Sequence, residues 1–194
     1  PSTAERNGTL DLLVVGAGPA GLACALEAKS QGLDHLLVDQ EQLGGTVAHY
    51  PRRKLVLTQP VELPRHGKLT RSSYLKEELI ELWQEVVRKE EVPLRTGLAL
   101  EDVVAKDGGF EVRFAGGEVL HARNVCLALG RCGTPRKLGV PGEEATKVSY
   151  GLVDAEGYRD QDLLVVGGGD SAIEAALGLA EQPGNRVTLS YRRS

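Results

Sequence analysis

The stretch DLLVVGAGPAGLACAL, from Asp11 to Leu26, decides the fold, and the chain repeats it almost unchanged as DLLVVGGGDSAIEAAL from Asp162 to Leu177. Each copy begins with a short apolar run, continues with a glycine-rich turn and ends with a segment of helical character. A short continuous apolar run is typical of a strand that is buried on both faces of a parallel sheet. The two copies therefore predict two strand–turn–helix units in one chain.

Both units continue into a further strand. In the first, a helix at residues 22–31 leads to an apolar strand at 36–38, which ends at Asp39. Such a β-α-β unit of about thirty residues has the size that a parallel crossover requires. The second unit repeats this order, with predicted strands at 163–166 and 186–191 and a helix at 171–181.

The region between the two units has a mixed pattern. Glycine and proline interrupt residues 40–70, so we expect mostly ordered loop there. An apolar stripe with helical spacing predicts an amphipathic helix over 74–91, capped by Ser72 or Ser73. Glycine pairs further on are hairpin signals, which predict an antiparallel meander. The expected strands are 98–104, 110–114, 118–125 and 125–129. Residues 131–161 are expected to be a connection.

These elements predict the α/β fold class. We expect a Rossmann-like, three-layer ββα domain with a small antiparallel meander, followed by an incomplete second Rossmann unit. A chain that stops at the second strand would expose an apolar sheet edge and helix face, so we expect this unit to be truncated. The predicted divisions are a leader at 1–10, a first domain at 11–132, a connection at 133–160 and the start of a second domain at 161–194.

The composition excludes several classes of protein. The chain has 194 residues, of which 41% are apolar and 26% charged, an ordinary globular balance. Its net charge of −4 provides no general attraction to nucleic acid or anionic lipid. No apolar run is long enough to cross a bilayer. We therefore expect no nucleic-acid partner and no membrane partner.

The cysteines indicate a reducing compartment. Cys24, Cys126 and Cys132 form no C-x-x-C pair, and three cysteines cannot complete a disulfide framework. Cys24 and Cys126 lie in apolar segments, where we expect them to pack in the core. Cys132 lies in a predicted loop, so its thiol is a candidate for reactivity. We expect a cytoplasmic protein.

The first glycine turn has the spacing Gly16-x-Gly18-x-x-Gly21 and joins a predicted strand directly to a predicted helix. In a dinucleotide-binding turn, the first glycine permits the bend, the second lets a pyrophosphate approach, and the third lets helix and strand pack closely. Free N–H groups at the helix N-terminus attract phosphate. With Asp39 placed to accept hydrogen bonds from ribose hydroxyls, the pattern predicts a dinucleotide site; a purely structural turn is the alternative.

The second turn, Gly167-x-Gly169-x-x-Ala172, keeps this spacing, but its second strand ends in Tyr191-Arg192-Arg193 in place of an acid. Guanidinium groups bind a 2′-phosphate, which a carboxylate would repel. This site is therefore predicted to prefer NADPH, unless both arginines merely form a solvated chain end. Two dinucleotide sites in one chain indicate electron transfer between two dinucleotides, so we assign FAD to the first site and NADPH to the second.

Several stretches together resemble the thioredoxin-reductase-like flavoproteins, a branch of the two-dinucleotide-binding family. They are VVGAGPAGLACAL at 14–26, the glycine pair at 44–45, VCLALGRCGTPRKLGVPGEE at 125–144, VVGGGDSAIEAAL at 165–177 and VTLSYRR at 187–193. The resemblance covers nearly the whole chain. It implies an FAD-dependent oxidoreductase that passes electrons from NADPH through flavin to a protein or small-molecule acceptor. We also expect a homodimer.

The resemblance implies a set of cofactor-binding residues. Those for FAD are Gly16, Gly18, Pro19, Ala20, Gly21, Asp39, Gln40, Gly44, Gly45, Thr46, Val104, Ala128, Leu129 and Gly130. Those for NADPH are Gly167, Gly169, Asp170, Ser171, Ala172, Arg192 and Arg193. No catalytic residue and no metal ligand can be named, because the four histidines form no metal-spaced cluster. Among them only His49, close to the glycine pair, is of interest.

The chain departs from the thioredoxin reductases at one place that matters for function. Those enzymes carry a redox C-x-x-C before the second glycine turn, whereas the corresponding stretch here, VSYGLVDAEGYRDQD at 148–162, contains no cysteine. Dithiol exchange at that position is therefore excluded. The chain instead resembles ferredoxin–NADP reductases of the thioredoxin-reductase type and bacillithiol-disulfide-reductase-like proteins, the latter also through HYPRRKLVLTQPVELP at 49–64.

The acceptor stays open at this stage. A basic loop at residues 52–71 is either a solvated surface or a docking surface for an acidic, ferredoxin-like partner. A low-molecular-weight disulfide is the other acceptor that the resemblance implies. Two further alternatives share the glycine turns: a dinucleotide-binding or redox-sensing module without turnover, and a flavin monooxygenase.

Overall fold

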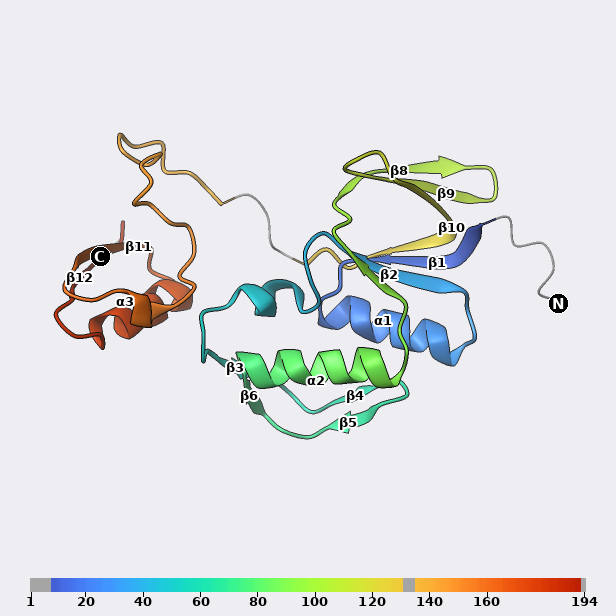
Figure 1. Ribbon diagram of the computed structural model, residues 1–194, viewed down its shortest axis with the longest axis horizontal. Coiled ribbons are helices and arrows are strands. Elements are labelled where there is room, and N and C mark those ends of the chain that lie inside the picture. The colour runs from blue at the N-terminus through green and yellow to red at the C-terminus, as the bar shows by residue number, and fades with distance from the viewer. Residues whose placement is uncertain (1–7, 131–134, 193–194) are drawn as a thin grey trace. The chain divides into compact units, whose positions relative to one another are not determined.

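The computed structural model describes residues 8–130 and 135–192, and they form two compact units (Figure 1). The first unit is Pro1–His49 with Leu55–Gly133, and the second is Tyr50–Lys54 with Thr134–Ser194. The predicted leader falls mainly on residues outside the described ranges, as do Cys132 and Arg193. Each unit is considered by itself below.

The first unit is built on a six-stranded sheet with the order β7-β2-β1-β10-β9-β8. Strands β1, β2, β7 and β10 run parallel, whereas β8, β9 and β10 form the antiparallel meander. The strands are β1 (Thr9–Val15), β2 (His35–Asp39), β7 (Leu94–Thr96), β8 (Leu100–Lys106), β9 (Gly109–Phe114) and β10 (Val119–Leu127). Helix α1 (Pro19–Ser30) makes the crossover from β1 to β2 and packs against β1, β2 and β10 (Figure 1).

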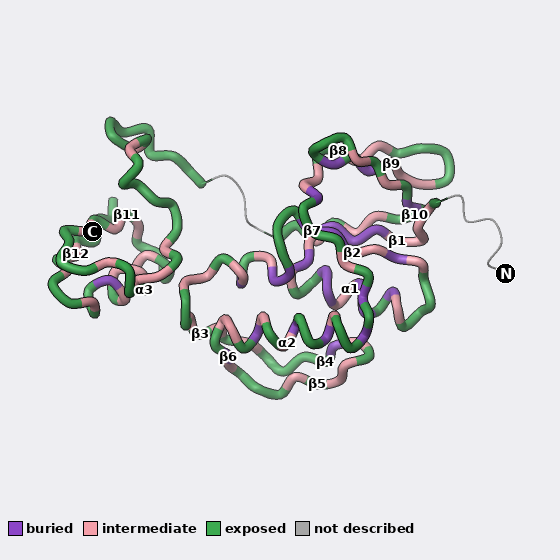
Figure 2. The backbone as a smooth tube through the Cα atoms, viewed as in Figure 1, coloured by how far each residue is buried: buried purple, intermediate pink, exposed green. Residues whose placement is uncertain are grey.

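The core lies on both faces of the parallel strands, where Figure 2 shows the buried backbone concentrated. Alternate side chains of a strand point to opposite faces. Leu13 and Val15 of β1 therefore share one face, and they pack with Val112 and Phe114 of β9. Val14 points to the other face, toward α1. Burial on both faces explains why the stretch from Leu12 to Val15 of β1 is apolar without polar alternation.

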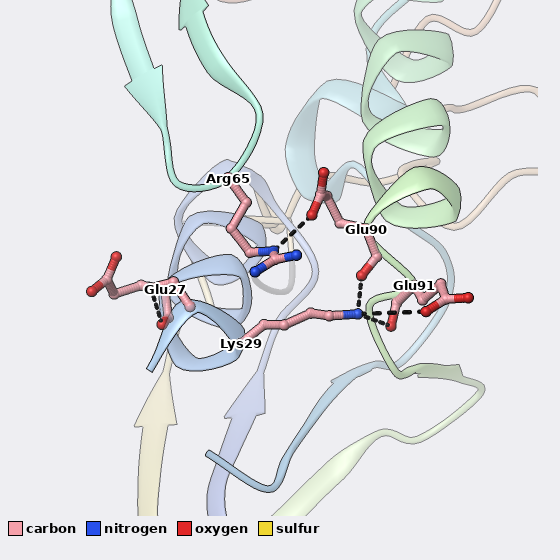
Figure 3. Close-up of polar contacts among 6 residues, drawn as sticks. Glu27, Lys29, Arg65, Glu90 and Glu91 are labelled. Atoms are coloured by element: carbon pink, nitrogen blue, oxygen red, sulfur yellow. Dashed lines mark hydrogen bonds and ion pairs between the residues drawn. The ribbon is translucent and has the colours of Figure 1, made fainter. Parts of the chain in front are cut away.

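Helix α2 (Lys76–Lys89) and two small hairpins complete the first unit. Figure 3 shows how Lys29 of α1 donates to the backbone carbonyl of Glu90, just beyond α2, while Arg65 Nε donates to Glu90 Oε2 at 2.7 Å. Arg65 lies between β4 (Val61–Leu63) and β5 (Gly67–Leu69). These contacts tie α1, the end of α2 and the β4–β5 hairpin together.

Two expectations about local structure were wrong in detail, and a third was incomplete. Residues 40–70 are mostly loop, as expected, but they also contain the 3-10 helix η1 (Gly45–His49), β3 (Leu55–Leu57), which pairs with β6 (Ser73–Leu75), and the β4–β5 hairpin. The predicted strands 118–125 and 125–129 are one strand, β10, which pairs with β9 near its start and with β1 from His121 to Leu127. Ser72 and Ser73 do not cap α2; Leu75 is the N-cap residue, and its N–H donates to Glu78 at 2.8 Å.

The second unit repeats the strand–turn–helix order on a smaller scale. Strands β11 (Asp162–Val166) and β12 (Arg186–Ser190) pair in parallel, α3 (Asp170–Ala180) connects them, and a 3-10 turn, η2 (Ala155–Gly157), precedes them. Several apolar side chains of this unit are exposed, among them Leu164 and Leu177. Within the described ranges, no helix combines the length and the apolar character needed to cross a membrane.

Candidate functional site

The first glycine turn lies between β1 and α1, and two of its glycines are required by the fold itself. Gly16 has a φ of 107°, and a Cβ there would overlap the backbone carbonyl of Ala128. A Cβ on Gly21 would overlap the carbonyl oxygen of Gly16. These two positions are therefore glycine because the turn, α1 and the end of β10 approach one another so closely.

Gly18 differs from its two neighbours in the motif. Its φ of −77° and ψ of −175° are accessible to any residue, and a Cβ there would meet no described atom closer than Gly45 Cα at 3.9 Å. Gly18 is the N-cap residue of α1, and no side chain in the described ranges caps that helix end. The next two residues, Pro19 and Ala20, are exposed. The helix N-terminus therefore opens to solvent at a glycine that the protein's own packing does not require.

Asp39 lies at the end of β2, where its side chain bonds to the turn. Its Oδ2 accepts a hydrogen bond from the buried N–H of Ala17 at 2.7 Å, and its Oδ1 accepts one from the N–H of Glu41 at 2.9 Å. The residue is only 9% exposed. The sequence predicted that Asp39 accepts hydrogen bonds from a ribose, but it did not reveal that the carboxylate also holds the glycine turn in place.

Other predicted residues of the first site gather around this turn. The N–H of Gly44 donates to the carbonyl of Ala17 at 2.8 Å, which brings Gly45 against Gly18. The N–H of Ala128, directly after β10, donates to the carbonyl of Val15 at 2.7 Å. A Cβ on Gly130 would lie 3.9 Å from Thr46 Oγ1, so these two segments also approach each other.

Some predicted residues lie at the margin of this cluster. Gln40 and Leu129 are exposed beside it. Val104 lies on β8, which β9 and β10 separate from β1 in the sheet order. His49 ends η1 and its Nε2 lies 3.3 Å from the carboxylate of Glu41. That contact gives His49 a partner on the surface of the protein.

The second turn reproduces the backbone geometry of the first. The N–H of Gly16 donates to Val38 at 2.8 Å, and the N–H of Gly167 donates to Ser190 at 2.9 Å. Gly169 is the N-cap residue of α3, with a φ of −91° and ψ of 172°, and a Cβ there would meet none of the described atoms within 4 Å. The middle glycine is again one that the fold does not require.

The strand tips of the two units differ in chemistry. Val15 pairs with Val38 in the first unit, and Val166 pairs with Ser190 in the second. The residue equivalent to Asp39 is therefore Tyr191, and the equivalent of Gln40 is Arg192. The sequence analysis named Tyr191 at this strand tip but assigned a role only to the two arginines. Counting residues would not have matched it to Asp39, because Tyr191 follows Gly167 by 24 residues whereas Asp39 follows Gly16 by 23.

The polar residues around the second turn, at the start of α3 and after β12, are exposed. Asp170 and Ser171 begin α3 in solvent, and Ala172 lies beside Gly167. Arg192 is exposed, and among the described residues no acidic side chain pairs with it. The paired arginine predicted at position 193 lies outside the described residues.

A comparison with protein families identifies this arrangement. The family model described as pyridine nucleotide-disulphide oxidoreductase matches residues 13–194, from β1 to the end of the chain. The chain belongs to the pyridine nucleotide-disulphide oxidoreductase family. This membership confirms the resemblance noted from the glycine turns, and the α/β, Rossmann-like fold class with it.

The named proteins to which the chain is similar include several reductases. The chain is 34% identical to a ferredoxin–NADP reductase of Ignicoccus hospitalis and 34% identical to a thioredoxin reductase of Mycolicibacterium smegmatis, each over 94% of the chain. Among solved structures it matches the bacillithiol disulfide reductase Bdr (YpdA) of Staphylococcus aureus with a TM-score of 0.86 and 25% identity, over 96% of the chain. The chain spans 56%, 55% and 58% of these proteins, a little over half of each.

The basic loop is largely neutralised by neighbouring acids. In the second unit, Arg52 lies 3.2 Å from Asp154, and Lys54 lies 2.6 Å from Glu174. Arg53 pairs with Glu156 in the same unit, while Arg65 and Arg71 of the first unit pair with Glu90 and Glu78. These pairs reduce the excess positive charge that a docking surface for an acidic partner would need.

The other reactive groups among the described residues are side chains of metal-ligating types and two thiols. In the described ranges, no group of three or more His, Cys, Asp or Glu side chains is arranged to hold a metal ion. Burial and a hydrogen bond with Cys126 raise the pKa of the Cys24 thiol to about 11, which keeps it protonated at neutral pH. Cys24 and Cys126 are partly buried, between α1 and β10.

Proposed function

We propose that this chain carries the two dinucleotide sites of an FAD-dependent NADPH reductase, with FAD at the first turn and NADPH at the second. The observation that supports this proposal is the middle glycine of each turn. Gly18 and Gly169 have ordinary backbone angles and open space where a Cβ would stand, so the fold does not explain the absence of a side chain. A pyrophosphate that approaches the backbone at that point does explain it.

The residues of the first turn fit an FAD pyrophosphate. The N-terminus of α1 provides N–H groups and a partial positive charge, and the exposed Ala20 leaves that end accessible. Asp39 holds the turn through Ala17 and, at the strand tip, would accept a hydrogen bond from a ribose hydroxyl. Gly44, Gly45 and Thr46 lie beside Gly18 and would border the remainder of the cofactor. When bound, the flavin supplies the two-electron redox chemistry of the proposed reaction.

The second turn fits a phosphorylated dinucleotide. The N-terminus of α3 is exposed, as the N-terminus of α1 is. Arg192 would bind the 2′-phosphate of NADPH, since its guanidinium has no acidic partner among the described residues. Arg193 would act with it. The absence of a carboxylate at this strand tip removes the repulsion that the equivalent position of the first unit would exert.

The flavin site is tested by two glycine variants that separate fold from binding. Gly18→Ala adds a methyl group into open space, so we expect a loss of stability of at most about 1 kcal/mol, the cost of alanine at a helix N-cap. The same methyl group would occupy the proposed pyrophosphate position. The amount of FAD that copurifies with the chain should therefore fall at least about tenfold. Gly151→Ala, which also enters open space, is the matched control and should retain the wild-type flavin content.

The result is read from the visible absorption spectrum and from a urea unfolding curve. Normal flavin content in Gly18→Ala would contradict the placement of FAD at this turn. A wild-type chain without flavin absorption would favour the alternative of a nucleotide-binding module without turnover. Bleaching of the flavin on addition of NADPH, with a weaker response to NADH, is the expected result for the wild type.

The acceptor is proposed at the level of two classes. Relatives named ferredoxin–NADP reductase support a ferredoxin-like protein, and the likeness to bacillithiol disulfide reductase supports a low-molecular-weight disulfide. The neutralised basic loop weakens the first option, because few of its charges remain without a partner. NADPH oxidation in the presence of ferredoxin, and separately of bacillithiol disulfide, distinguishes them.

A homodimer and a cytoplasmic location complete the proposal. Light scattering of the purified protein tests the first, and fractionation of the source cells tests the second. A monomeric mass would contradict the dimer without affecting the dinucleotide sites, because the described residues of each site come from a single unit of the chain.

A further inference from the structure

The second turn carries a feature that the dinucleotide motif does not require. Gly168, between the first two glycines of the motif, is equivalent to Ala17 in the first unit. A Cβ on Gly168 would overlap Cδ2 of Tyr191 and stand 2.6 Å from its Cγ, so the aromatic ring lies directly over the Gly168 backbone. The position is glycine because the ring occupies the space of a side chain.

Tyr191 occupies the strand-tip position that Asp39 occupies in the first unit. In both units this residue reaches back to the residue after the first glycine. Asp39 does so by accepting a hydrogen bond from Ala17, whereas Tyr191 does so by laying its ring on Gly168. The exchange of a carboxylate for an aromatic ring is therefore coupled to the exchange of alanine for glycine in the turn.

The ring is exposed on its other side. Tyr191 is 57% exposed although one face lies against the turn, so the opposite face is open to solvent. In a Rossmann unit this strand tip adjoins the adenosine ribose of the bound dinucleotide. An adenine base is therefore the flat, apolar group that would lie next to this open face.

We propose that Tyr191 is the adenine platform of the second dinucleotide site and that Gly168 is glycine so that the ring can lie in this place. This inference rests on the proposed NADPH site and adds the residue that recognises the base. Arg192, one residue further along, then binds the 2′-phosphate on the ribose of the same adenosine. The pair together selects a 2′-phosphorylated adenine nucleotide.

The affinity for adenosine 2′,5′-bisphosphate, measured by calorimetry on the full chain, tests the proposal. Removal of the ring in Tyr191→Ala should raise the Kd about tenfold, in the range expected for one aromatic–base stack. Tyr191→Phe keeps the ring and should bind within about twofold of the wild type. Tyr150→Ala is the matched control, because Tyr150 is a tyrosine of the same unit, 51% exposed, that bonds to Glu143 instead of the turn.

Gly168→Ala gives a test of the coupling between the two residues. Its methyl group displaces the ring, so this variant should also bind more weakly. Once the ring is absent, the methyl group has nothing to displace, so Gly168→Ala combined with Tyr191→Ala should bind like Tyr191→Ala alone. Fully additive losses of affinity in the double variant would show that residue 168 acts on the ligand directly. They would overturn the proposal that residue 168 is glycine in order to accommodate the Tyr191 ring.

The adenine protons provide a signal that a merely structural role of Tyr191 would not produce. Their H2 and H8 resonances should move upfield on binding to the wild type and to Tyr191→Phe, but not on binding to Tyr191→Ala. A wild type that binds the bisphosphate, with Tyr191→Ala equal to it in affinity and shift, would overturn the platform and leave the NADPH site intact. A wild type that does not bind the bisphosphate would refute the NADPH site itself.

Discussion

Asp39→Ala is the substitution that best separates the two roles of the residue at the first strand tip. If its carboxylate served only a bound ribose, its removal would leave the ligand-free protein as stable as before. The structure indicates otherwise, because both carboxylate oxygens accept hydrogen bonds from backbone N–H groups of Ala17 and Glu41. We therefore expect the variant to lose stability in the absence of any cofactor.

The size of the loss follows from the two hydrogen bonds. Ala17 is fully buried, and a buried N–H without a partner costs about 1–3 kcal/mol. The bond to the N–H of Glu41 is partly buried and contributes about 1 kcal/mol more. Asp39→Ala should thus lower the free energy of unfolding of the first unit by about 2–4 kcal/mol. Asp39→Asn keeps the shape and one acceptor oxygen, so it should lose roughly half as much.

Urea unfolding followed by tryptophan fluorescence measures this loss in the correct unit. Trp83 is the single tryptophan of the chain and lies buried in α2 of the first unit. With a slope of about 2 kcal/mol per molar urea, the midpoint should fall by about 1–2 M. Asp102→Ala is the matched control, because this exposed carboxylate bonds only the adjacent N–H of Val103 and pairs loosely with Arg113.

A change below about 0.5 kcal/mol in Asp39→Ala, equal to that of Asp102→Ala, would refute the reasoning. It would mean that the carboxylate does not hold the turn when no ligand is bound. A large loss in both variants would instead indicate a general sensitivity of the unit to loss of negative charge.

Three further predictions concern packing, pH dependence and thiol chemistry. Phe114→Ala should destabilise the first unit by about 3–5 kcal/mol in urea unfolding, because its fully buried ring fills the core beside the sheet; Phe114→Leu should cost less than half of this. The hydrogen bond from Arg65 lowers the pKa of Glu90 below the ordinary 4.5, so their pairing stabilises the fold above that pH and is lost as the pH falls through the lowered folded-state pKa. Arg65→Ala should therefore be less stable than the wild type at neutral pH, with the difference vanishing in acid; a difference that persists there would contradict the assignment. Burial and the contact with Cys126 raise the pKa of the Cys24 thiol to about 11. Cys24 should therefore react slowly with iodoacetamide at neutral pH, and faster only as the pH approaches 11. Rapid labelling of Cys24 at neutral pH, detected by peptide mass spectrometry, would contradict this.

Much of the fold was predictable because its signals are local. The run from Leu12 to Val15 indicates a strand buried on two faces, and β1 is that strand. The amphipathic pattern over 74–91 predicted α2 to within two residues at each end, with Leu79, Trp83 and Val86 buried as the stripe requires. The glycine spacing placed both turns between a strand and a helix. Each of these patterns depends on neighbours within a few residues, which the sequence alone displays.

The expectations that were wrong depend on residues far apart in the chain. A second strand after residue 125 was expected because the apolar pattern changes there, yet β10 runs on as one strand, since β1 pairs with it from His121 to Leu127. The basic loop appeared unpaired in sequence because the acids that neutralise Arg52 and Lys54 lie about a hundred residues later. Short strands at 55–57 and 61–63 were missed because their partners, and not their own composition, make them strands.

By itself, the sequence determined that this protein has two strand–turn–helix units of the dinucleotide-binding type, with an acid at one strand tip and arginines at the other. Only the tertiary structure decided which glycines the fold needs and which it leaves open, because overlap with a distant carbonyl or ring is a property of packing. It also decided that Asp39 bonds to Ala17 and that Tyr191, not an arginine, is its counterpart over Gly168. Pairing between strands sets that register, and one additional residue between β11 and β12 is enough to change it.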